Sequence, residues 1–488
     1  MSNELNAAGA PPARETRDPA TQSSRLKGRM GVIELVFTVL AWSAPIMVVS
    51  AVIPYLIGFG GTGAPLAFVI AMAILLVFSV GYTAMTRYVD NPGAFYAYIT
   101  AGIGRLPGLG ASFLAIVGYL FMATATYIFI GNSLGALLEM MGAPAIPWYL
   151  YSFAVLVITG VLGYFRIDLS AKVLSVVMVC EIAIVLIFDG AVVGKGGPEG
   201  IPLSSFTWGA LVSGSAGVAV LFAALSFGGF EATAIFREET KNPRKTVPRA
   251  TYLAVGAIGV FYIAATWLLI AAFGPTQAGQ AAATDPTGMF SASVQQFVGT
   301  WAKDVVTVLV VTSAFAALLS VQNIVSRYCF SLGVDRVLPA RLGKVHARHG
   351  SPYISSVTVS LVLFVILLAF SGIDSPDLWY AQLAGTGGFA IMVLMTLTSI
   401  AVIAFFRRRR DIRDSTRWHI APLLSALGMG AVLYLAITNF TTLTGGSKTE
   451  AVAEQAIVWG VFAAGMVLAL VYRRKRPGVY ARIGRQKA

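Results

Sequence analysis

Residues 226–231 place a glycine pair and a carboxyl group in the middle of an apolar stretch, roughly residues 211–236. A stretch of this length can cross a bilayer as a helix, and the sequence Ser-Phe-Gly-Gly-Phe-Glu would weaken that helix at mid-depth. Inside a membrane, broken backbone is tolerated only where it is buried in protein or lines a watery cavity. The segment therefore predicts a site for a small solute, with an acid beside it.

A second interruption lies in the first apolar stretch, at the sequence Ser-Ala-Pro-Ile-Met of residues 43–47. Pro45 cannot donate a hydrogen bond to the carbonyl of Ala41, and the half-helix after it would present free N–H groups to a carboxylate. Free carbonyls before the two breaks, at residues 41–43 and 225–227, would accept an ammonium group. A solute with both charges is an α-amino acid. The alternative is an ordinary packing kink, since proline is common in membrane helices.

Two carboxyl groups lie deep in apolar stretches, those of Glu181 and Glu231. Each costs about 2.5–3.5 kcal/mol at a helix centre on insertion scales, so we expect each to have a role that offsets this cost. Glu231 could take up a proton during coupling or gating, or it could brace the break by hydrogen bonds. Glu181 could cycle a proton, ligate a cation or pair with a cationic substrate. The residues alone leave these alternatives open.

Composition indicates a membrane protein with many spans. The 488 residues are 57% hydrophobic and 12% charged, whereas soluble domains average about 25% charged residues, and the mean hydropathy is +0.77. Apolar stretches near 20 residues long recur about twelve times. They lie at roughly 31–57, 64–86, 109–137, 148–165, 169–193, 211–236, 250–273, 304–331, 352–371, 378–405, 418–440 and 455–472.

The Lys and Arg residues behind the net charge of +13 are distributed as the expected topology requires. With both termini and every second loop in the cytoplasm, all Lys and Arg residues except Lys195, Lys303 and Lys448 lie on the cytoplasmic side. This is the positive-inside rule, and it predicts a multi-pass protein of the cell membrane. The basic runs at 407–410 and 473–476 have the same explanation. No aromatic-interleaved basic domain accompanies them, so we expect no nucleic-acid partner.

Residues 1–29 are rich in Pro, Ala and charge, and they predict a disordered cytoplasmic tail. Cys180 and Cys329 lie in or at the ends of different spans, where we expect packing residues instead of a disulfide. Two histidines at i, i+3 in a cytoplasmic loop could reach one metal ion, but no Cys or acid cluster completes a site. We therefore expect no metal and no cofactor. The histidines are His346, His349 and His419.

Three segments carry a resemblance to a known family. Residues 227–250 resemble the sixth-helix signature of the amino acid-polyamine-organocation (APC) permeases, a Gly-x-Glu break followed by Glu-Glu-Thr-Lys-Asn-Pro-x-x-x-x-Pro-x-Ala. Residues 88–105, with Asn-Pro-Gly-Ala-Phe-Tyr-Ala-Tyr, resemble the loop that enters helix three of these permeases. Residues 326–339, which end in Gly-Val-Asp-Arg-Val-Leu-Pro, resemble the loop after helix eight. The resemblance covers about residues 31–410, and the last two spans are generic.

The resemblance implies an all-α membrane protein of the LeuT type with twelve transmembrane helices, the solute lying between broken helices one and six. Two inverted five-helix repeats, about 31–193 and 211–405, would form a ten-helix core at 30–405. Two peripheral helices at 406–472 and a basic cytoplasmic tail at 473–488 would follow. The chain departs from the family at 45–48, where Pro-Ile-Met-Val replaces the usual Gly-x-Gly-Ile. It also departs at Glu181, near which family members often carry a lysine.

Side chains around the breaks would select the substrate, with Phe227 as a lid. Further candidates on helices three, eight and ten could equally be structural. The charged candidates at the cytoplasmic ends of the spans could form ion pairs that close an inner gate, or they could be solvated loop charges. The substrate-binding candidates are Ser43, Ala44, Pro45, Ile46, Met47, Ser226, Phe227, Gly228, Gly229, Tyr119, Ser320, Asn323 and Gln382; the coupling candidates are Glu181 and Glu231; the gate candidates are Arg87, Glu238, Glu239 and Arg327.

These features predict a secondary transporter of amino acids or related amines that works by alternating access in membrane lipid. Protons, or alternatively Na⁺, would drive it, and an exchanger or an ethanolamine-type permease would use the same site. A non-transporting sensor on this fold should carry a long cytoplasmic extension, and the expected tails are short. We expect no enzyme, because the sequence contains no nucleotide-binding loop or catalytic cluster. Two broken helices that can clasp a solute favour a carrier over a channel.

Overall fold

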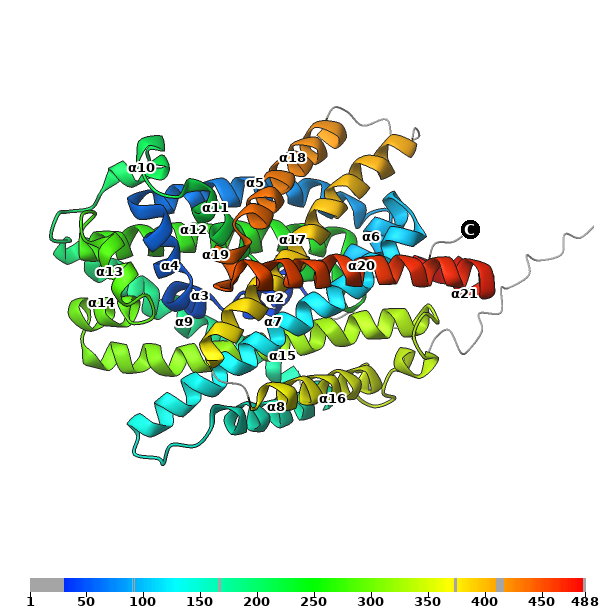
Figure 1. The fold of residues 1–488 in the computed structure, drawn as a ribbon, viewed down its shortest axis with the longest axis horizontal. Coiled ribbons are helices and arrows are strands. Elements are labelled where there is room, and N and C mark those ends of the chain that lie inside the picture. Colours follow the sequence, from blue (N-terminus) through cyan, green and yellow to red (C-terminus); the bar gives the residue numbers. More distant parts are fainter. Residues whose placement is uncertain are drawn as a thin grey trace, which may run out of the picture.

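The computed structural model describes residues 30–485 apart from 90, 92, 166–167, 373–374 and 410–416, and it describes only the backbone of 168–174, 417–419 and 485. The predicted tail at 1–29 and the side chain of His419 lie outside this part. Twelve segments of the described chain are long and apolar enough to cross a membrane, as the sequence predicts. They run side by side along the longest axis of the molecule (Figure 1). The described residues contain no strand, only an isolated bridge between Met30 and Thr240.

The helices follow the apolar stretches, and several extend beyond them at one or both ends. Helix α20, for example, starts at a capping box in which Ser447 and Glu450 exchange hydrogen bonds. The first half of the chain contains α2 (Val32–Ser43), α3 (Pro45–Ala51), α4 (Ile53–Gly60), η1 (Gly61–Gly63), α5 (Ala64–Met85), α6 (Ala94–Gly102), α7 (Arg105–Met140), α8 (Trp148–Phe165), α9 (Asp168–Lys195), η2 (Leu203–Phe206), α10 (Trp208–Val212), α11 (Ala216–Leu225) and η3 (Phe230–Glu239). The second half contains α12 (Pro243–Phe273), α13 (Ala278–Thr284), α14 (Met289–Phe297), α15 (Thr300–Val334), η4 (Ala340–Gly343), α16 (Tyr353–Phe370), α17 (Pro376–Arg408), α18 (Arg417–Thr438), α19 (Phe440–Thr444), α20 (Lys448–Lys475), α21 (Pro477–Arg482) and η5 (Ile483–Arg485).

Helix contacts pair the two halves of the core. Helices α5, α7 and α8 pack against α12, α15 and α16, each partner lying five spans later in the chain. Other contacts match in the same way: α2 with α12 corresponds to α5 with α11, and α7 with α17 corresponds to α9 with α15. Replacing each span by the span five places before or after it thus turns one pair of contacting helices into the other. Two five-helix repeats produce this symmetry of contacts.

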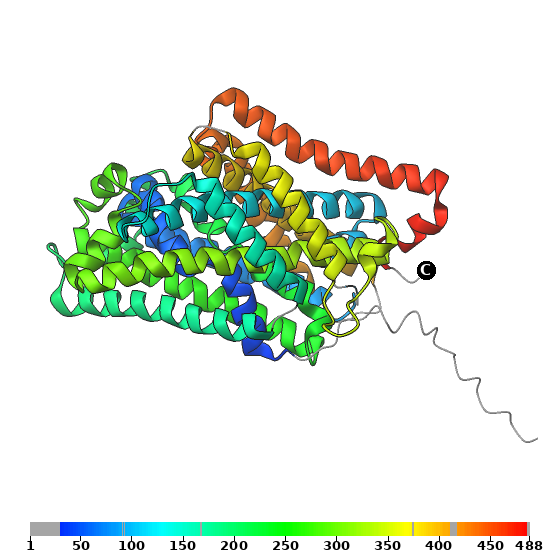
Figure 2. The same cartoon turned by 90° about the horizontal axis from the view of Figure 1, so that it is seen from below.

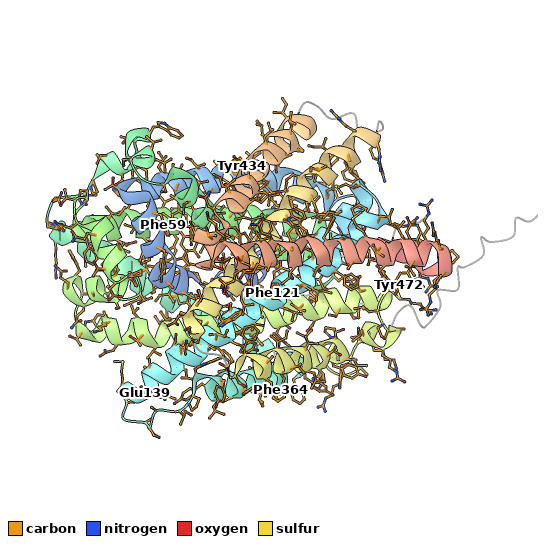
Figure 3. The ribbon with its side chains drawn as sticks, in the orientation of Figure 1. Phe59, Phe121, Glu139, Phe364, Tyr434 and Tyr472 are labelled. Atoms are coloured by element: carbon orange, nitrogen blue, oxygen red, sulfur yellow. The ribbon has the colours of Figure 1, made fainter. Side chains whose placement is uncertain are left out.

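Helices α18 and α20 lie at the periphery, where α18 contacts α5 and α17 and α20 runs along α7 (Figures 1 and 2). Large apolar side chains point outward from the bundle, as Phe364 on α16 and Tyr434 on α18 illustrate (Figure 3). Tyr434 is 66% exposed, an unfavourable position in water but a normal one against lipid chains. The outer surface therefore agrees with the membrane assignment made from composition.

The first helix breaks at Ala44, one residue before the proline that predicts the break. Ala44 has φ +44° in the left-handed region, and it separates α2 from α3. Pro45 then occupies the first position of α3, where its missing N–H costs nothing and its fixed φ suits a helix start. The break exposes the first N–H groups of α3 inside the bundle.

The second break lies at residues 226–229, where α11 ends and η3 begins. Gly229 has φ +113°, and the ten residues after it form a 3-10 helix, although 3-10 runs longer than about 3–4 residues are uncommon. A Cβ atom on Gly229 would lie 2.5 Å from Cδ1 of Trp42 and 3.0 Å from the carbonyl oxygen of Val39. Glycine is required here by both the backbone angle and the close approach of α2.

Gly229→Ala should therefore destabilise the folded protein by about 1–3 kcal/mol through the strained backbone angle, with the contact to Trp42 adding to the loss. Gly228→Ala is the matched control, because a Cβ atom there would meet nothing nearer than the Leu225 carbonyl oxygen at 3.5 Å. Thermal unfolding of the detergent-purified variants measures the difference. Equal melting temperatures for the two variants would contradict the assigned geometry of the break.

Candidate functional site

The two helix breaks are joined by a direct hydrogen bond. The Ser43 hydroxyl donates to the carbonyl of Gly228 at 2.8 Å, and the Tyr262 hydroxyl donates to the carbonyl of Ser43 at 3.3 Å. The sequence predicts that the carbonyls of residues 41–43 and 225–227 are free for an ammonium group. In this conformation the carbonyl of Ser43 has the Tyr262 donor instead, and that of Leu225 accepts the N–H of Gly228 at 3.1 Å. The physical reason is that buried carbonyls take the donors within reach.

The exposed N-terminus of α3 holds a carboxylate, as its dipole predicts, but the carboxylate belongs to the protein. The N–H of Ile46 donates to Oε2 of Glu181 at 3.3 Å, and the Ser313 hydroxyl donates to the same oxygen at 3.0 Å. Glu181 is only 1% exposed. This one carboxyl group thus connects α3 with α9 and α15, and it can hold a charge or a proton at the break.

Glu231 connects the second break to α7 and α5. The Tyr119 hydroxyl donates to Oε1 at 2.7 Å, the N–H of Gly229 donates to Oε2 at 2.8 Å, and the Tyr82 hydroxyl donates to the Glu231 main-chain carbonyl at 2.5 Å. Both carboxylate oxygens therefore have donors. These are the hydrogen bonds that the bracing alternative for Glu231 requires, and its role stays a prediction.

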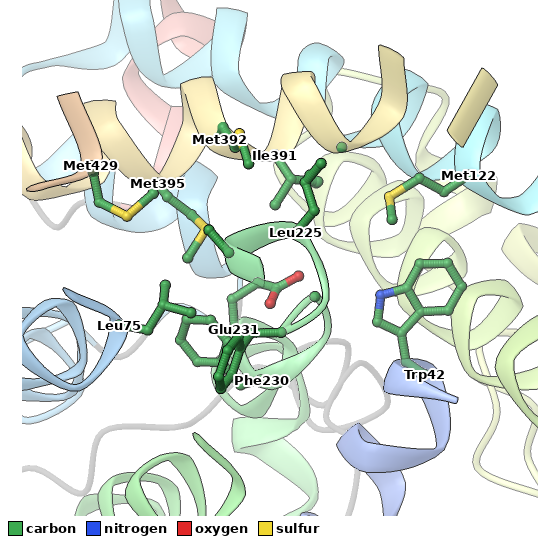
Figure 4. Close-up of a pocket in the computed structure, with 14 residues that line it drawn as sticks. Trp42, Leu75, Met122, Leu225, Phe230, Glu231, Ile391, Met392, Met395 and Met429 are labelled. Carbon is green, nitrogen blue, oxygen red and sulfur yellow. The ribbon is translucent and has the colours of Figure 1, made fainter. Parts of the chain in front are cut away.

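A small cavity lies against the second break, between α17 and α18 on one side and α2 and η3 on the other (Figure 4). The space open to the centre of a water molecule is about 20 Å³, enough for roughly one water. Of the predicted substrate-binding residues, Phe227 and Gly228 line it, and so does the coupling candidate Glu231. The Glu231 carboxylate points toward the cavity between Leu225 and Trp42 (Figure 4).

The other predicted side chains around the breaks are mostly packed. Phe227 is buried against the rings of Phe68 and Tyr262, and the Ser226 hydroxyl donates to the carbonyl of Phe222 within its own helix. Ala44, Pro45 and Ile46 are buried and Met47 is half-buried. Phe227 is thus part of the wall beside the break, and its role as a lid stays a prediction.

The four weaker substrate-binding candidates lie in different surroundings. Tyr119 belongs to the site through Glu231 and packs edge-on against Trp42. Ser320 is buried, and its hydroxyl has no hydrogen-bond partner within the described part of the chain. The Asn323 side chain donates to the carbonyl of Leu319. Gln382 lies beside Gly446, before α20, and the structure does not bring it to the breaks.

At the end of the bundle that carries Met30, two gate candidates form a buried ion pair. Nε of Arg327 lies 2.6 Å from Oε1 of Glu239, and the guanidinium stacks 4.5 Å above the ring of Phe236. Arg87 is exposed and takes part in no ion pair among the described residues. Glu238 is half-buried.

Main-chain bonds hold the same end of the bundle together. The N–H of Met30 donates to the carbonyl of Glu239 at 2.8 Å, and the N–H of Lys241 donates to the carbonyl of Met30 at 3.1 Å. Arg237 adds a contact that sequence reasoning missed, because it donates to the carbonyls of Thr86 and Val89 at the end of α5. Nothing in the local sequence separates this buried arginine from the loop charges around it.

Asp189 is the other residue that sequence reasoning missed. It lies eight residues after Glu181 on α9, is 6% exposed, and has no hydrogen bond to either carboxylate oxygen within the described chain. Its place near the end of an apolar stretch suggests contact with water outside the membrane. The packing of neighbouring helices buries it instead.

The structure describes the side chains of both cysteines and of two of the histidines. Cys329 is buried, as expected, whereas Cys180 is exposed on the outside of α9, and both are free thiols. The rings of His346 and His349 lie 4.6 Å apart, and Nδ1 of His346 accepts the N–H groups of Arg348 and His349 at 3.2 Å each. One ring nitrogen is thus used to hold the loop.

Comparison with known proteins bears on the same regions. The family described as "Amino acid permease" matches residues 30–471. The branched-chain amino acid permease BcaP of Lactococcus lactis subsp. cremoris is 26% identical over 77% of this chain and 82% of its own length. The BcaP of Bacillus subtilis is 24% identical, over 85% and 86%. The low-affinity putrescine importer PlaP of Escherichia coli K12 is 25% identical, over 85% and 90%. Because the family match covers all twelve candidate spans almost completely, the chain belongs to the amino acid permease family of the APC superfamily and is a multi-pass membrane transporter.

Proposed function

We propose that the protein carries α-amino acids or closely related amines across the cell membrane by proton-coupled alternating access, with both termini in the cytoplasm. The observation that carries this proposal is the hydrogen bond from the Ile46 N–H to the buried carboxyl group of Glu181. The names of the relatives, branched-chain amino acid permease and putrescine importer, support the substrate range. The proposal includes the predicted division into a core at 30–405, helices at 406–472 and a basic tail at 473–488.

Coupling follows from competition at the N-terminus of α3. A substrate carboxylate would seek the same free N–H groups that Glu181 now occupies, and two negative charges in one buried place repel each other. A proton on Glu181 removes this conflict and leaves the N–H groups to the substrate. Binding of substrate and binding of a proton therefore favour each other, as symport requires.

Glu231 keeps the second break in shape during this cycle. Its bonds to Gly229 and Tyr119 hold the turn between α11 and η3, so its protonation would loosen the link between helix six and α7. We assign it a bracing and gating role, and we assign the proton-carrying role to Glu181. The substrate ammonium group would then meet the carbonyls of the two breaks once Ser43 and Tyr262 release them.

The ion pair of Arg327 and Glu239 is the proposed inner gate. It joins the end of η3 to α15, and the bridge at Met30 joins the start of α2 to the same place. Opening toward the cytoplasm must separate these elements. The outer side is also closed, because the rings of Phe59 and Phe222 stack 5.7 Å apart and the Ser215 N–H donates to the Phe59 carbonyl at 2.8 Å. The structure therefore corresponds to an occluded state in this proposal.

Reconstitution of the purified protein in liposomes tests the coupling. The wild-type protein should accumulate at least one of a panel of radiolabelled amino acids and amines under an inward proton gradient. Glu181→Gln should bring the ratio of uptake with and without the gradient close to one, because the amide oxygen can still accept from the Ile46 N–H but the side chain cannot gain or lose a proton. Glu139→Gln, an exposed acid at the end of α7 (Figure 3), should leave the ratio unchanged.

Other results of the liposome experiment would change or contradict the proposal. Full proton stimulation in Glu181→Gln would remove Glu181 from the mechanism. Stimulation by a sodium gradient alone, or uptake only against preloaded substrate, would replace proton symport with sodium coupling or exchange. No uptake of any amino acid or amine would sink the proposed function.

The gate can be tested by labelling a cysteine behind it. Asn323→Cys, in a chain whose native cysteines are changed to Ser, lies one turn from Arg327 on α15. Adding Glu239→Gln should raise its reaction rate with a membrane-impermeant maleimide in inside-out vesicles several-fold, because breaking a buried pair leaves an uncompensated charge that costs about 3–5 kcal/mol in the closed state. Arg87→Gln is the control, and an equal rise in both variants would contradict the gate.

A further inference from the structure

The C-terminal end of the chain folds back onto the bundle. Helix α20 ends at Lys475, Pro477 starts the short helix α21, and the chain turns inward at Gly484, which has φ +74°. Ile483 and Gly484 are both buried. The basic tail that the sequence predicts at 473–488 therefore contains a docked segment, residues 477–484.

One main-chain N–H joins this segment to two elements of the core. The N–H of Gly484 donates to the hydroxyl oxygen of Tyr96, on α6, at 2.5 Å. It also lies 3.2 Å from Oδ2 of Asp335, the residue that follows α15. The Tyr96 hydroxyl in turn donates to the same Asp335 oxygen at 2.7 Å. Because Tyr96 and Asp335 are buried, the segment completes an interior cluster of hydrogen bonds between α6 and α15.

The surroundings of Gly484 leave no room for a side chain. A Cβ atom there would lie 2.6 Å from Cγ2 of Thr100 on α6, and the positive φ already favours glycine. Nearby, the guanidinium carbon of Arg105 lies 5.5 Å from the centre of the Tyr480 ring, a distance at which a cation and a ring attract each other. The docking thus depends on a close fit as well as on hydrogen bonds.

The two elements that the segment joins both lead to the proposed inner gate. Arg327 of the gate lies about two turns before Asp335 along α15, and it pairs with Glu239 of η3. On the other side of η3, Arg237 donates to two carbonyls at the end of α5, just before α6. In the proposed cycle η3 leaves α15 when the gate opens, and these bonds would draw the start of α6 away from the end of α15.

The docked segment opposes this separation. The Gly484 N–H bonds to one atom on each side, so the movement of α6 away from α15 must break at least one of its bonds. Hydrogen-bonding groups that lose a partner while buried are costly. Docking of the segment and closure of the gate therefore favour each other, as any two coupled equilibria do.

We propose that residues 477–484 are a latch that stabilises the inward-closed conformation by bridging Tyr96 of α6 and Asp335 of α15, and that its release lets the inner gate open more readily. This inference rests on the inner gate of the proposed function. It is independent of the substrate and of the coupling ion.

A buried cysteine in the segment reports whether it is docked. Ile483→Cys, in a chain whose native cysteines are changed to Ser, should react slowly with a membrane-impermeant maleimide in inside-out vesicles. Adding Gly484→Ala should raise the rate at least about fivefold, the population change for the smallest strain expected of a non-glycine residue at such an angle. Gly478→Ala is the matched control, because a Cβ atom there would meet nothing within 4 Å. Equal rates in the two variants would contradict the docking.

A second cysteine reports whether the latch acts on the gate. The reaction rate of Asn323→Cys should rise several-fold with Gly484→Ala and stay unchanged with Gly478→Ala, although neither substitution touches the gate pair. Tyr96→Phe should give the same rise, because it removes the hydroxyl that joins Gly484 to Asp335. An unchanged rate at Asn323→Cys in protein whose segment has undocked would overturn the latch and leave the segment a purely structural element.

Failure of the latch can be told apart from failure of the proposed function. If Glu239→Gln also leaves the rate at Asn323→Cys unchanged, the gate assignment is wrong and the latch fails with it. If no amino acid or amine is taken up while Gly484→Ala still raises that rate, the proposed transport activity fails and the latch stands.

Discussion

Two helices of this protein are interrupted at a depth where lipid cannot form hydrogen bonds, so some of their peptide N–H and C=O groups have no partner within the helix. The surrounding side chains meet this demand: Glu181 and Ser313 at the N-terminus of α3, Ser43 and Tyr262 at the carbonyls, and Glu231 at the turn before η3. Every other part of the site is arranged around these bonds. In the proposed mechanism, a substrate binds by exchanging with these bonds, so the bonds that stabilise this conformation are the ones that transport would break.

The hydrogen bonds at the breaks explain why the buried acids Glu181 and Glu231 are tolerated. A carboxyl group inside a membrane is expensive, and Glu181 recovers part of the cost from the dipole of α3 and two hydrogen bonds, while Glu231 recovers it from a tyrosine and a main-chain N–H. Asp189 has no such partners in the described chain, although it lies on the same helix as Glu181. Glu181, Glu231 and Asp189 are thus all buried but differ in their hydrogen-bond partners.

At both ends of the bundle, the two interrupted helices contact each other. At one end, the start of α2 and the end of η3 are tied by main-chain bonds and by the Arg327–Glu239 pair. At the other end, Phe59 of α4 and Phe222 of α11 stack. Because each of the two helices is interrupted at its break, the proposed mechanism lets one end open without the other.

The sequence by itself determined the all-helical membrane class, the spans, both breaks and the two acids beside them, Glu181 and Glu231. These follow from local properties: the length of apolar runs, proline without an N–H, and glycine at an angle that other residues avoid. Only the tertiary structure decided that the Glu181 carboxylate accepts the N–H of Ile46, 135 residues away in the sequence. It also decided that Arg327 pairs with Glu239 and that Gln382 lies away from the breaks. The burial of Arg237 and Asp189 likewise depends on the packing of the helices. The physical reason is that such contacts depend on which helix faces pack together, and a local pattern of apolar and charged residues leaves that choice open.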